Sequence, residues 1–342
     1  MRTSDFDYAL PEKLIAQRPA SPRESARLLV VDRVKDSLSH ARVKDLPAFL
    51  KKGDVLVVNV SKVFKARLTG KLDDGKKSEI ELFLVRPEGK FWRALGRPGR
   101  KLEHGSKIAV ARGFVATVQW KDADGSLLVD FGMSKDQVIR KANLHGDVPL
   151  PPYIKRKPRT PAEYQTAYAK TVGSVAAPTA GFHLTKALMA KLKKKGVTFL
   201  EVTLHVGLGT FMPIRSEHLE EHKMHAEQVE IPEKTVREIL RAKIERRRVI
   251  TVGTTTLRAL EGAAERCGGE ICAWHGDVDL FITPGFRFRV ADALMTNFHL
   301  PKSTLLVLVS AFAGQERVLK AYQEAVKRKY RFFSYGDAML LA

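Results

Sequence analysis

The sequence is poor in cysteine, because Cys267 and Cys272 are the only two among 342 residues. Two cysteines cannot build a disulfide framework, and two thiols alone do not supply the ligand set of a structural zinc site. We therefore expect two ordinary thiols in a reducing compartment.

The sequence also lacks the segments that direct export or membrane insertion. The N-terminus, MRTSDFDYALPEKL, contains no apolar stretch typical of a signal peptide. The longest apolar run, residues 305–312, is interrupted by Ser310 and is far shorter than the roughly 20 residues that a membrane helix needs. These absences predict a soluble, cytoplasmic protein without a membrane partner.

Acidic residues are the third deficit. Asp and Glu total 38 against 59 Lys and Arg, so the formal net charge is 59 − 38 = +21. Such an excess attracts polyanions through counterion release and long-range steering. We favour a nucleic-acid partner over a basic surface that only keeps the protein soluble, but charge alone does not distinguish RNA from DNA.

Alternating strand-like and helix-like segments make up most of the chain. Hydrophobic residues account for 44% of the sequence, which is enough for a core, and the length suggests two domains. The apolar run at 54–59 is typical of a strand buried on both faces. The patterns predict helices over 11–16, 46–50, 185–195, 232–248, 257–266 and 315–328, and strands over 27–32, 197–204, 249–252 and 280–282. This alternation predicts an α/β architecture.

Residues 64–150 have a different pattern. Short alternating runs are separated by turn signals such as Asp73-Asp74-Gly75 and Arg97-Pro98-Gly99. Short strands at this spacing predict a small all-β barrel or sandwich. We therefore predict an inserted β-barrel domain at 64–150 and a discontinuous α/β catalytic domain formed by 1–63 and 151–342.

A basic run at 155–159 follows the predicted insertion and is accompanied by Tyr153, Tyr164 and Tyr168. Basic and aromatic side chains together are typical of segments that hold single-stranded RNA. A solvated linker has the same composition, and the sequence favours neither interpretation.

Two blocks rich in Gly, Thr and His flank the predicted helix at 185–195. The first, GSVAAPTAGFHLT, contains Thr179, Gly181 and His183, and the second, EVTLHVGLGTFMP, contains His205 and Gly207. Small residues let a ligand approach the backbone, and a histidine just before a helix lies where free N–H groups attract negative charge. The second block lacks the third glycine of a dinucleotide-binding motif, so we interpret it as a glycine turn beside a ligand.

The segment at 222–227 contains His222, His225 and Glu227. On a helix the two histidines would share a face. No fourth ligand accompanies them and the motif is not H-E-x-x-H, so we favour an acid/base or hydrogen-bonding site over a metal site.

Two further motifs place polar groups at helix entrances. Gly253, Thr254, Thr255 and Thr256 follow a predicted strand and open a helix that also carries Arg258; N-capping explains one threonine but not three. Similarly, Asn297 and His299 precede a helix expected near Ser303. A last motif, residues 330–339, offers aromatic surface and the carboxylate of Asp337.

Together these motifs resemble the S-adenosylmethionine:tRNA ribosyltransferase-isomerase family of the queuosine pathway. The resembling stretches follow the family's order over nearly the whole chain and are weakest at about 72–131; they are SDFDYALPEKLIAQRP, SARLLVVDR, GDVLVVN with ARLTG, SVAAPTAGFHLT, HVGLGTF, HKMHAE, VGTTTLRALE, TNFHLPKSTLLVLVSAFAG and YRFFSYGDAMLL. The resemblance implies a larger α/β domain with a small β-barrel insertion.

The resemblance also implies a reaction. The ribosyl part of S-adenosylmethionine would be transferred to 7-aminomethyl-7-deazaguanine at the tRNA wobble position and isomerised, giving epoxyqueuosine-tRNA, adenine and methionine. S-adenosylmethionine would be consumed as a substrate, tRNA would be the partner, and neither a metal nor a separate cofactor is implied. The resemblance leaves the oligomeric state open, and we favour a monomer.

That chemistry requires bases, a carboxylate-binding corner and a dry pocket. Our hypothesis assigns base or proton-shuttle roles to four residues, His183, His225, Glu227 and His299, and an orienting role to Asn297. Residues 253–256 with Arg258 would hold the methionine carboxylate. Substrate contacts are also expected from Thr179, Gly181, His205, Gly207 and Asp337.

The chain departs from the family pattern at two places. Asn59-Val60-Ser61-Lys62 stands where the family usually has Asn-Asp-Thr-Arg, so any substrate role of that aspartate is vacant here. Phe182 and Leu184 exchange the usual leucine and phenylalanine, which indicates repacking of the core. Two alternative functions remain beside the ribosyl transfer. They are a non-catalytic RNA-binding protein and an S-adenosylmethionine-dependent RNA methyltransferase.

Overall fold

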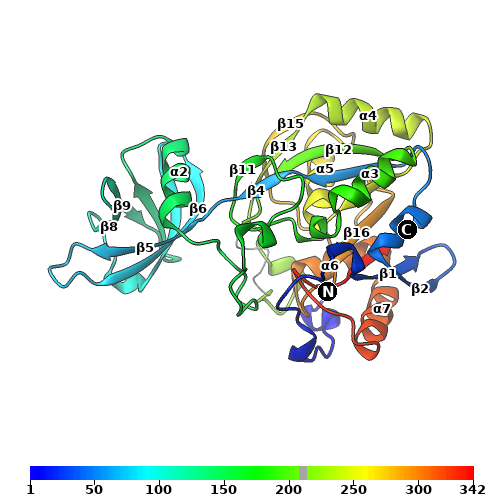
Figure 1. Ribbon diagram of the computed structural model, residues 1–342, viewed down its shortest axis with the longest axis horizontal. Helices are drawn as coiled ribbons and strands as arrows, with labels where there is room; N and C mark the ends of the chain where they lie inside the picture. The colour runs from blue at the N-terminus through cyan, green and yellow to red at the C-terminus, as the bar shows by residue number, and fades with distance from the viewer. Residues whose placement is uncertain (208–213) are drawn as a thin grey trace. The chain divides into compact units, whose positions relative to one another are not determined.

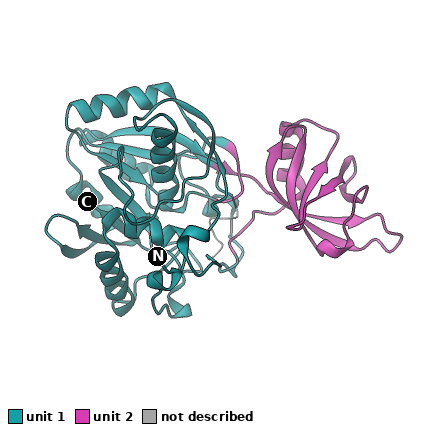
Figure 2. Cartoon of the chain, turned by 180° about the vertical axis from the view of Figure 1, so that it is seen from behind, with its two compact units in different colours: residues 1–61, 152–171, 177–342 teal, residues 62–151, 172–176 magenta. Residues whose placement is uncertain are grey.

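The computed structural model describes residues 1–207 and 214–342. The chain divides into two compact units, coloured separately in Figure 2. The larger unit comprises residues 1–61, 152–171 and 177–342, and the smaller comprises 62–151 and 172–176. The predicted fold class, an α/β unit together with a β-barrel, is confirmed. Residues 172–176, which the sequence pattern assigned to the larger domain, belong to the smaller unit.

A mixed sheet forms the centre of the larger unit (Figure 1). Among the described residues it has nine strands, in the order β15-β13-β12-β3-β14-β16-β17-β1-β2. The neighbours β12, β3, β14 and β16 run parallel to one another, as do β17 and β1. The strands are β1 Arg27–Asp32, β2 Ser37–Arg42, β3 Val55–Asn59, β12 Thr198–Leu204, β13 Glu227–Ile231, β14 Val249–Val252, β15 Trp274–Val278, β16 Ala293–Asn297 and β17 Ala338–Leu341.

Helices cover both faces of this sheet because successive residues of its strands point to opposite sides. Leu28 of β1 packs in an apolar cluster with Leu188 of α3, whereas its neighbour Leu29 packs in a second cluster with α6 and α7. The strands β3, β14, β16 and β17 are buried along their whole length, as strands covered on both faces must be. The helices of the unit are α1 Leu46–Phe49, α3 Lys186–Lys194, α4 Glu233–Ile244, α5 Thr254–Arg266, α6 Thr304–Ala313 and α7 Gln315–Lys327.

Most predicted elements of the larger unit are present, but one predicted strand is wrong. Residues 280–282 are irregular chain whose apolar side chains pack against the second cluster. The strand lies instead at β15, an edge strand in which most side chains are exposed or half-buried. Its sequence, WHGDV, is therefore polar and does not read as a buried strand. The strand β2 also escaped prediction, since its side chains are likewise mostly exposed.

The smaller unit contains a closed barrel with the strand order β10-β7-β6-β5-β8-β9. Its strands are β5 Arg67–Leu72, β6 Glu79–Glu88, β7 Phe91–Arg97, β8 Lys107–Ala111, β9 Phe114–Lys121 and β10 Ser126–Asp130. The helix α2, Lys135–His145, was not predicted; Ser134 caps it by accepting the Gln137 backbone N–H. A two-stranded sheet pairs β4 Ser61–Val63 with β11 Thr171–Ser174.

Short 3-10 helices occur between these elements. They are η1 Thr3–Phe6, η2 Glu12–Leu14, η3 Arg23–Ser25, η4 Val43–Asp45, η5 Gly99–Lys101, η6 Pro161–Tyr164, η7 Thr179–His183 and η9 Leu219–Glu221. Within residues 1–207 and 214–342, no helix combines the length and the apolar character needed to cross a bilayer.

The two cysteines are joined by a disulfide, which contradicts the expectation of two free thiols. Cys267 ends α5, and the following Gly268 and Gly269 both have positive φ values, 73° and 104°. These glycines reverse the chain, so the Cα atoms of Cys267 and Cys272 lie 6.2 Å apart. That separation is within the range that a disulfide spans.

Asn59 links β3 to β12 at the edge of the sheet where the parallel strands end. Its amide Nδ2 donates to the Leu204 carbonyl at 2.9 Å, and its Oδ1 accepts the Leu204 N–H at 3.1 Å and the Ser61 N–H at 3.0 Å. Asn59 is fully buried, so no water can replace these bonds.

Asn59→Ala is therefore expected to lower the free energy of unfolding by roughly 2–3 kcal/mol, because buried backbone groups lose their partners. Urea unfolding measures the change. Asp32→Ala is the matched control, since the Asp32 carboxylate also accepts two backbone N–H groups, from Val34 and Lys35, but at the surface. Equal losses from the two variants would contradict the role given to Asn59.

Candidate active site

The register of the parallel strands brings three motifs to one edge of the sheet. Val252 of β14 pairs with Val58 of β3 and with Met295 of β16. The residues that follow, among them Gly253 and Thr296, therefore reach the carboxyl ends of the strands at the same level. Ligands bind in this position in open α/β sheets.

A pocket with about 660 Å³ of empty space, its open mouth included, lies at this edge. None of its lining side chains carries a formal charge if the histidine is neutral. The lining consists of Tyr153, Ala177, Pro178, Thr179, Ala180, Val206, Gly253, Thr254, Thr255, Thr296, Asn297, Phe298, His299, Leu300, Ser303, Leu305, Phe333 and Ser334.

The N-terminus of α5 forms one wall of the pocket. Gly253 precedes this helix with φ of 94°, a conformation that favours glycine. Thr254 and Thr255 line the pocket, and the Thr255 hydroxyl has no hydrogen-bond partner among the described residues. The Thr256 hydroxyl instead donates to the Val252 carbonyl at 2.7 Å, so it is not available to a ligand. The free N–H groups of the first helical turn and two hydroxyls suit a carboxylate.

Asn297 connects the pocket to His183. Its Oδ1 accepts the Thr179 hydroxyl at 3.2 Å, and its Nδ2 lies 3.2 Å from Nε2 of His183. Burial lowers the pKa of His183 from 6.5 to about 4, so this imidazole is neutral at pH 7. With the Asn297 amide donating, Nε2 of His183 is the acceptor and its lone pair is occupied.

His299 lies on the pocket wall itself. Its Nε2 is 3.2 Å from the Thr296 hydroxyl, and its Nδ1 is 3.3 Å from the hydroxyl of Tyr322 on α7. Burial lowers its pKa to about 3. At pH 7 His183 and His299 are thus neutral hydrogen-bonding groups rather than cations.

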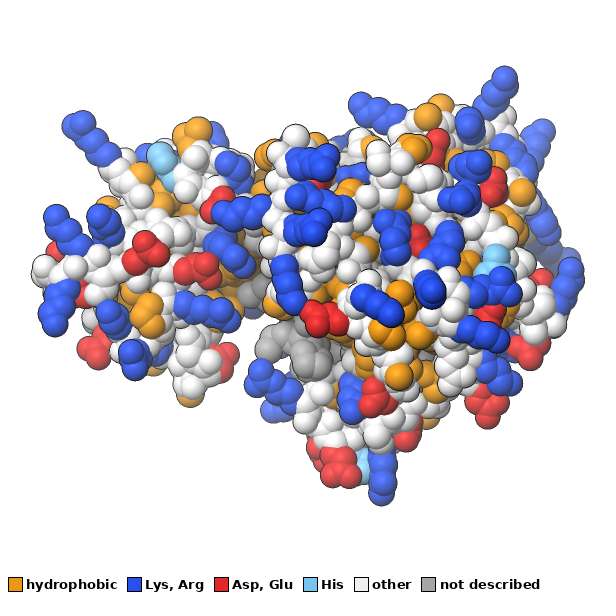
Figure 3. Space-filling view, turned by 60° about the horizontal axis from the view of Figure 1, so that its bottom comes forward, with side chains coloured by type: hydrophobic (Ala, Val, Ile, Leu, Met, Phe, Trp, Pro, Cys, Tyr) orange, Lys and Arg blue, Asp and Glu red, His pale blue; other side chains and the backbone are white. Residues whose placement is uncertain are grey.

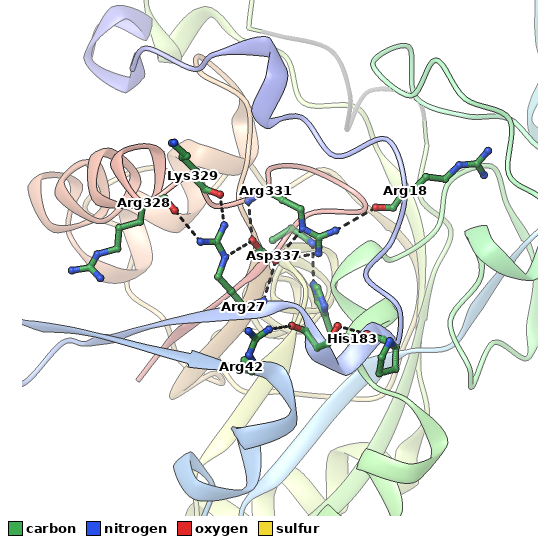
Figure 4. Close-up of polar contacts among 11 residues, drawn as sticks. Arg18, Arg27, Arg42, His183, Arg328, Lys329, Arg331 and Asp337 are labelled. Carbon is green, nitrogen blue, oxygen red and sulfur yellow. Dashed lines mark hydrogen bonds and ion pairs between the residues drawn. The ribbon is translucent and has the colours of Figure 1, made fainter.

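Asp337 is buried, and its carboxylate is bonded to groups of the protein itself (Figure 4). Its carboxylate accepts the backbone N–H groups of Arg27 and Arg331 at 3.0 and 2.8 Å and forms ion pairs with both guanidinium groups. From its motif, Asp337 is expected among the substrate contacts. Here it instead fixes the turn that carries Ser334, a pocket residue.

Glu227 and Arg258 form a buried ion pair outside the pocket lining. The second carboxylate oxygen of Glu227 accepts the Gly207 N–H at 2.9 Å. Arg258, predicted to hold a substrate carboxylate, is thus already paired with a protein carboxylate. Desolvation lowers its pKa to about 10, which leaves it charged at neutral pH.

The remaining predicted residues are not part of the pocket lining, although His205 and Gly207 flank Val206, which is. Residues 222–226 are irregular chain rather than a helix, so His222 and His225 do not share a helical face. His225 is exposed, whereas the ring of His222 lies edge-on against Phe281. The His205 N–H donates to the Gln228 carbonyl at 2.9 Å.

Gly181 and Gly207, both expected among the substrate contacts, have different surroundings. A Cβ at Gly181 would lie 2.0 Å from the Tyr168 hydroxyl, so the absence of a side chain at this position lets Tyr168, rather than a ligand, pack against the backbone. At Gly207 the nearest described atom to an added Cβ would be Oε1 of Glu227, at an ordinary contact distance of 3.9 Å. The rest of the second block, residues 208–213, lies outside the described residues. Among the residues that are described, no group of three or more His, Cys, Asp or Glu side chains is arranged to hold a metal ion.

Several residues of the site were not singled out from the sequence. Thr296 lies inside a recognised motif, and its hydroxyl could have been noticed there. Tyr322 gives no such signal, because an aromatic residue on the inner face of a helix is typical of a core. Arg27 and Arg331 come from opposite ends of the chain, and only the fold joins them at Asp337.

Comparison with known proteins shows the family of the chain. The family model described as "Queuosine biosynthesis protein" matches residues 3–341. A relative from Thermotoga maritima is 48% identical over 342 residues, and one from Citrifermentans bemidjiense is 49% identical over 346 residues; both alignments cover all of each chain. Both are named S-adenosylmethionine:tRNA ribosyltransferase-isomerase.

A crystal structure of S-adenosylmethionine tRNA ribosyltransferase from Thermotoga maritima is also similar. It aligns with a TM-score of 0.58 and 38% identity, covering 99% of this chain and 100% of the other. The chain therefore belongs to the queuosine biosynthesis protein family, and the resemblance stated from its motifs is confirmed.

The two buried histidines predict how stability depends on pH. An unfolded histidine binds a proton near pH 6.5, whereas His183 in the folded protein binds one only near pH 4 and His299 near pH 3. The stability that depends on keeping these two histidines neutral is thus fully present above pH 6.5. Below that value each histidine lowers the free energy of unfolding by about 1.4 kcal/mol per pH unit, until its folded-state pKa is reached.

Urea unfolding between pH 7 and pH 4.5 tests this dependence. In His183→Gln the free energy of unfolding is expected to fall less steeply with decreasing pH than in the wild type. In His225→Gln, a change at an exposed position, its pH dependence is expected to stay unchanged. An unchanged slope in His183→Gln would mean that this imidazole is not held neutral.

The buried ion pair predicts non-additive losses of stability. Arg258→Met or Glu227→Leu alone leaves one buried charge without its partner and is expected to lower the free energy of unfolding by about 3–5 kcal/mol. The double variant should recover part of that loss, as measured by urea unfolding. Arg241→Met, which breaks the exposed pair with Glu245, is the control and should change stability far less, because solvent screens an exposed ion pair. Additive losses from the two single variants would contradict the pairing.

Proposed function

We propose that this protein is an S-adenosylmethionine:tRNA ribosyltransferase-isomerase. In this reaction the ribosyl part of S-adenosylmethionine is transferred to 7-aminomethyl-7-deazaguanine at the tRNA wobble position and isomerised, with release of adenine and methionine. The observation that carries the proposal is that segments far apart in the sequence, around Thr179, Thr255 and Asn297, line one pocket in a chain that belongs to this family.

The pocket offers matched surfaces for the parts of S-adenosylmethionine. The hydroxyls of Thr254 and Thr255 at the start of α5 would hold the methionine carboxylate. This assignment no longer needs Arg258, which pairs with Glu227. Tyr153 and Phe333 also line the pocket, and their rings stack with centroids 4.7 Å apart. Aromatic faces suit both a planar purine and a sulfonium cation.

The reaction needs a proton to leave the carbon beside the sulfonium and a neutral amine on the tRNA base. His183 is neutral and therefore able to accept a proton, but its Nε2 is bonded to the Asn297 amide. His183 also lies outside the pocket lining, behind Asn297, so its proposed base role requires the Asn297 amide to turn away when substrate binds. His225 and Glu227 lie outside the pocket lining, so their proposed proton-shuttle roles receive no support from the geometry.

A tRNA partner is consistent with the charge of the protein. Lys and Arg side chains are spread over the face drawn in Figure 3, with fewer Asp and Glu among them. The exposed basic run at 155–159 begins two residues after Tyr153, which lines the pocket. We propose that this run receives the phosphates beside the modified base, in a cytoplasmic monomer that needs no metal and no cofactor other than the consumed S-adenosylmethionine.

Incubation with S-adenosylmethionine and tRNA carrying the deazaguanine base tests the proposal. Free adenine and the mass of the modified nucleoside are measured, with tRNA lacking the deazaguanine base as the control. We expect adenine release that depends on the modified base, and a ribosyl-derived mass increase at the wobble position.

Two other outcomes would overturn the proposal. Release of S-adenosylhomocysteine would identify a methyltransferase. Tight, salt-dependent binding of tRNA without adenine release would identify an RNA-binding protein or an inactive relative. In the second case Val60→Asp should be assayed first, because Val60 stands where the family usually has an aspartate and is buried in the apolar cluster beneath α3.

A further inference from the structure

His299 is held at both its backbone groups and its ring. Tyr322 accepts the backbone N–H of His299 at 3.0 Å, and the Tyr8 hydroxyl donates to the His299 carbonyl. The same Tyr322 hydroxyl lies 3.3 Å from Nδ1 of the imidazole. The rings of Tyr8 and Tyr322 pack edge to face with centroids 5.1 Å apart, so the two tyrosines that hold His299 also hold each other in place. Tyr8 lies inside the motif SDFDYALPEKLIAQRP but was not singled out there, and Tyr322 lies outside all of the quoted motifs.

The count of protons fixes the tautomer of His299. A phenol has one proton, and the Tyr322 oxygen already accepts the backbone N–H. If Nδ1 carried a proton, both contacts would be donors to this oxygen, and the Tyr322 proton would need another acceptor. Tyr322 is fully buried and is otherwise surrounded by the rings of Tyr8, Phe298 and Phe332. The Tyr322 proton therefore goes to Nδ1, and the imidazole carries its proton on Nε2.

This tautomer determines what Thr296 presents to the pocket. The Nε2–H group of His299 donates to the Thr296 hydroxyl oxygen at 3.2 Å. Thr296 is buried, lines the pocket, and has no second side-chain partner within the described part of the chain. Its own proton is then directed away from the imidazole. With the opposite tautomer, the Thr296 hydroxyl would donate its proton to Nε2 of His299, and only its oxygen lone pairs would face the pocket.

We propose that Tyr322 is a positioning residue that locks the His299 tautomer, so that the Thr296 hydroxyl is a hydrogen-bond donor to a nitrogen or oxygen acceptor of the bound substrate. The relay runs from Tyr322 through His299 to Thr296. The tautomer stands independently of the reaction, whereas the identity of the acceptor, an atom of S-adenosylmethionine, rests on the proposed function.

The relay gives His299 a role other than that of a base. Its Nδ1 lone pair accepts the Tyr322 proton and its Nε2 already carries a proton, so the neutral ring has no free site for a substrate proton. A fixed donor in a pocket whose lining carries no formal charge forms a stronger bond as the negative charge on its acceptor grows, as it does on a departing purine. The lowered pKa of His299 keeps the ring neutral at all working pH values.

The tautomer is read by NMR of protein labelled with ¹⁵N in its histidines, without any substrate. The His299 signals are assigned by difference from His299→Gln. In the wild type we expect a protonated Nε2 and an unprotonated Nδ1. In Tyr322→Phe we expect a mixture of tautomers or a protonated Nδ1. Tyr330→Phe is the matched control, because it removes a tyrosine bond to Nδ1 of another histidine, His40, and should leave the His299 signals unchanged.

Binding of S-adenosylmethionine, measured by calorimetry, tests the donor. Thr296→Val is expected to weaken binding about tenfold, the usual value of one hydrogen bond, and Thr296→Ser to retain most of the affinity. Tyr322→Phe should weaken binding in the same direction, and the double variant should bind no worse than Thr296→Val alone.

The outcomes separate this inference from the proposed function. A protonated Nδ1 in the wild type, or unchanged His299 signals in Tyr322→Phe, would overturn the relay, and the wild-type spectrum decides this even if the variant does not fold. Unchanged affinity in Thr296→Val, or additive losses in the double variant, would overturn the donor role. The expected spectra and affinities without adenine release would leave the relay standing and remove only the reaction.

Discussion

The parallel hydrogen bonding of β3, β14 and β16 is the constraint on which the site depends. These strands are buried on both faces, so a register slip of one residue would turn apolar side chains out of both clusters. The register that satisfies both faces also makes the strands end together. Gly253 and Thr296 therefore meet at one edge of the sheet, and Asn59 ties the neighbouring strand β12 to the same edge.

The chemistry of the site follows from keeping formal charges away from the pocket lining. The nearby buried charges are paired with one another, Glu227 with Arg258 and Asp337 with Arg27 and Arg331. What remains in the lining is a set of hydroxyls, an amide, a neutral imidazole and aromatic rings. In such surroundings a substrate that brings its own positive charge meets no competing cation. The weakly polar lining also makes each hydrogen bond to the reacting atoms stronger than it would be in water.

Much of the fold could be read from local patterns. The buried strand at 54–59, the threonine cap of α3 and the helix after Ser303 all depend on residues close in sequence, and the structure has each of them. The predictions failed where tertiary packing overrides the local pattern. Residues 280–282 are apolar because they cover a core cluster as a loop. The polar strand β15 exists because β13 offers it backbone partners. The disulfide forms because two glycines bring the cysteines together.

The candidate site shows the same division. The sequence by itself determined to which family the chain belongs. It also marked candidate motifs, since small residues, histidines and threonines at strand ends are local signals. Only the tertiary structure decided which of them share a pocket. It places Asn297 between Thr179 and His183, and it gives the carboxylates of Glu227 and Asp337 to arginines. It also sets a tyrosine from α7 behind His299. Hydrogen bonds and ion pairs act over a few ångströms in space, and residues far apart in the chain reach that distance only through the packing of the folded protein.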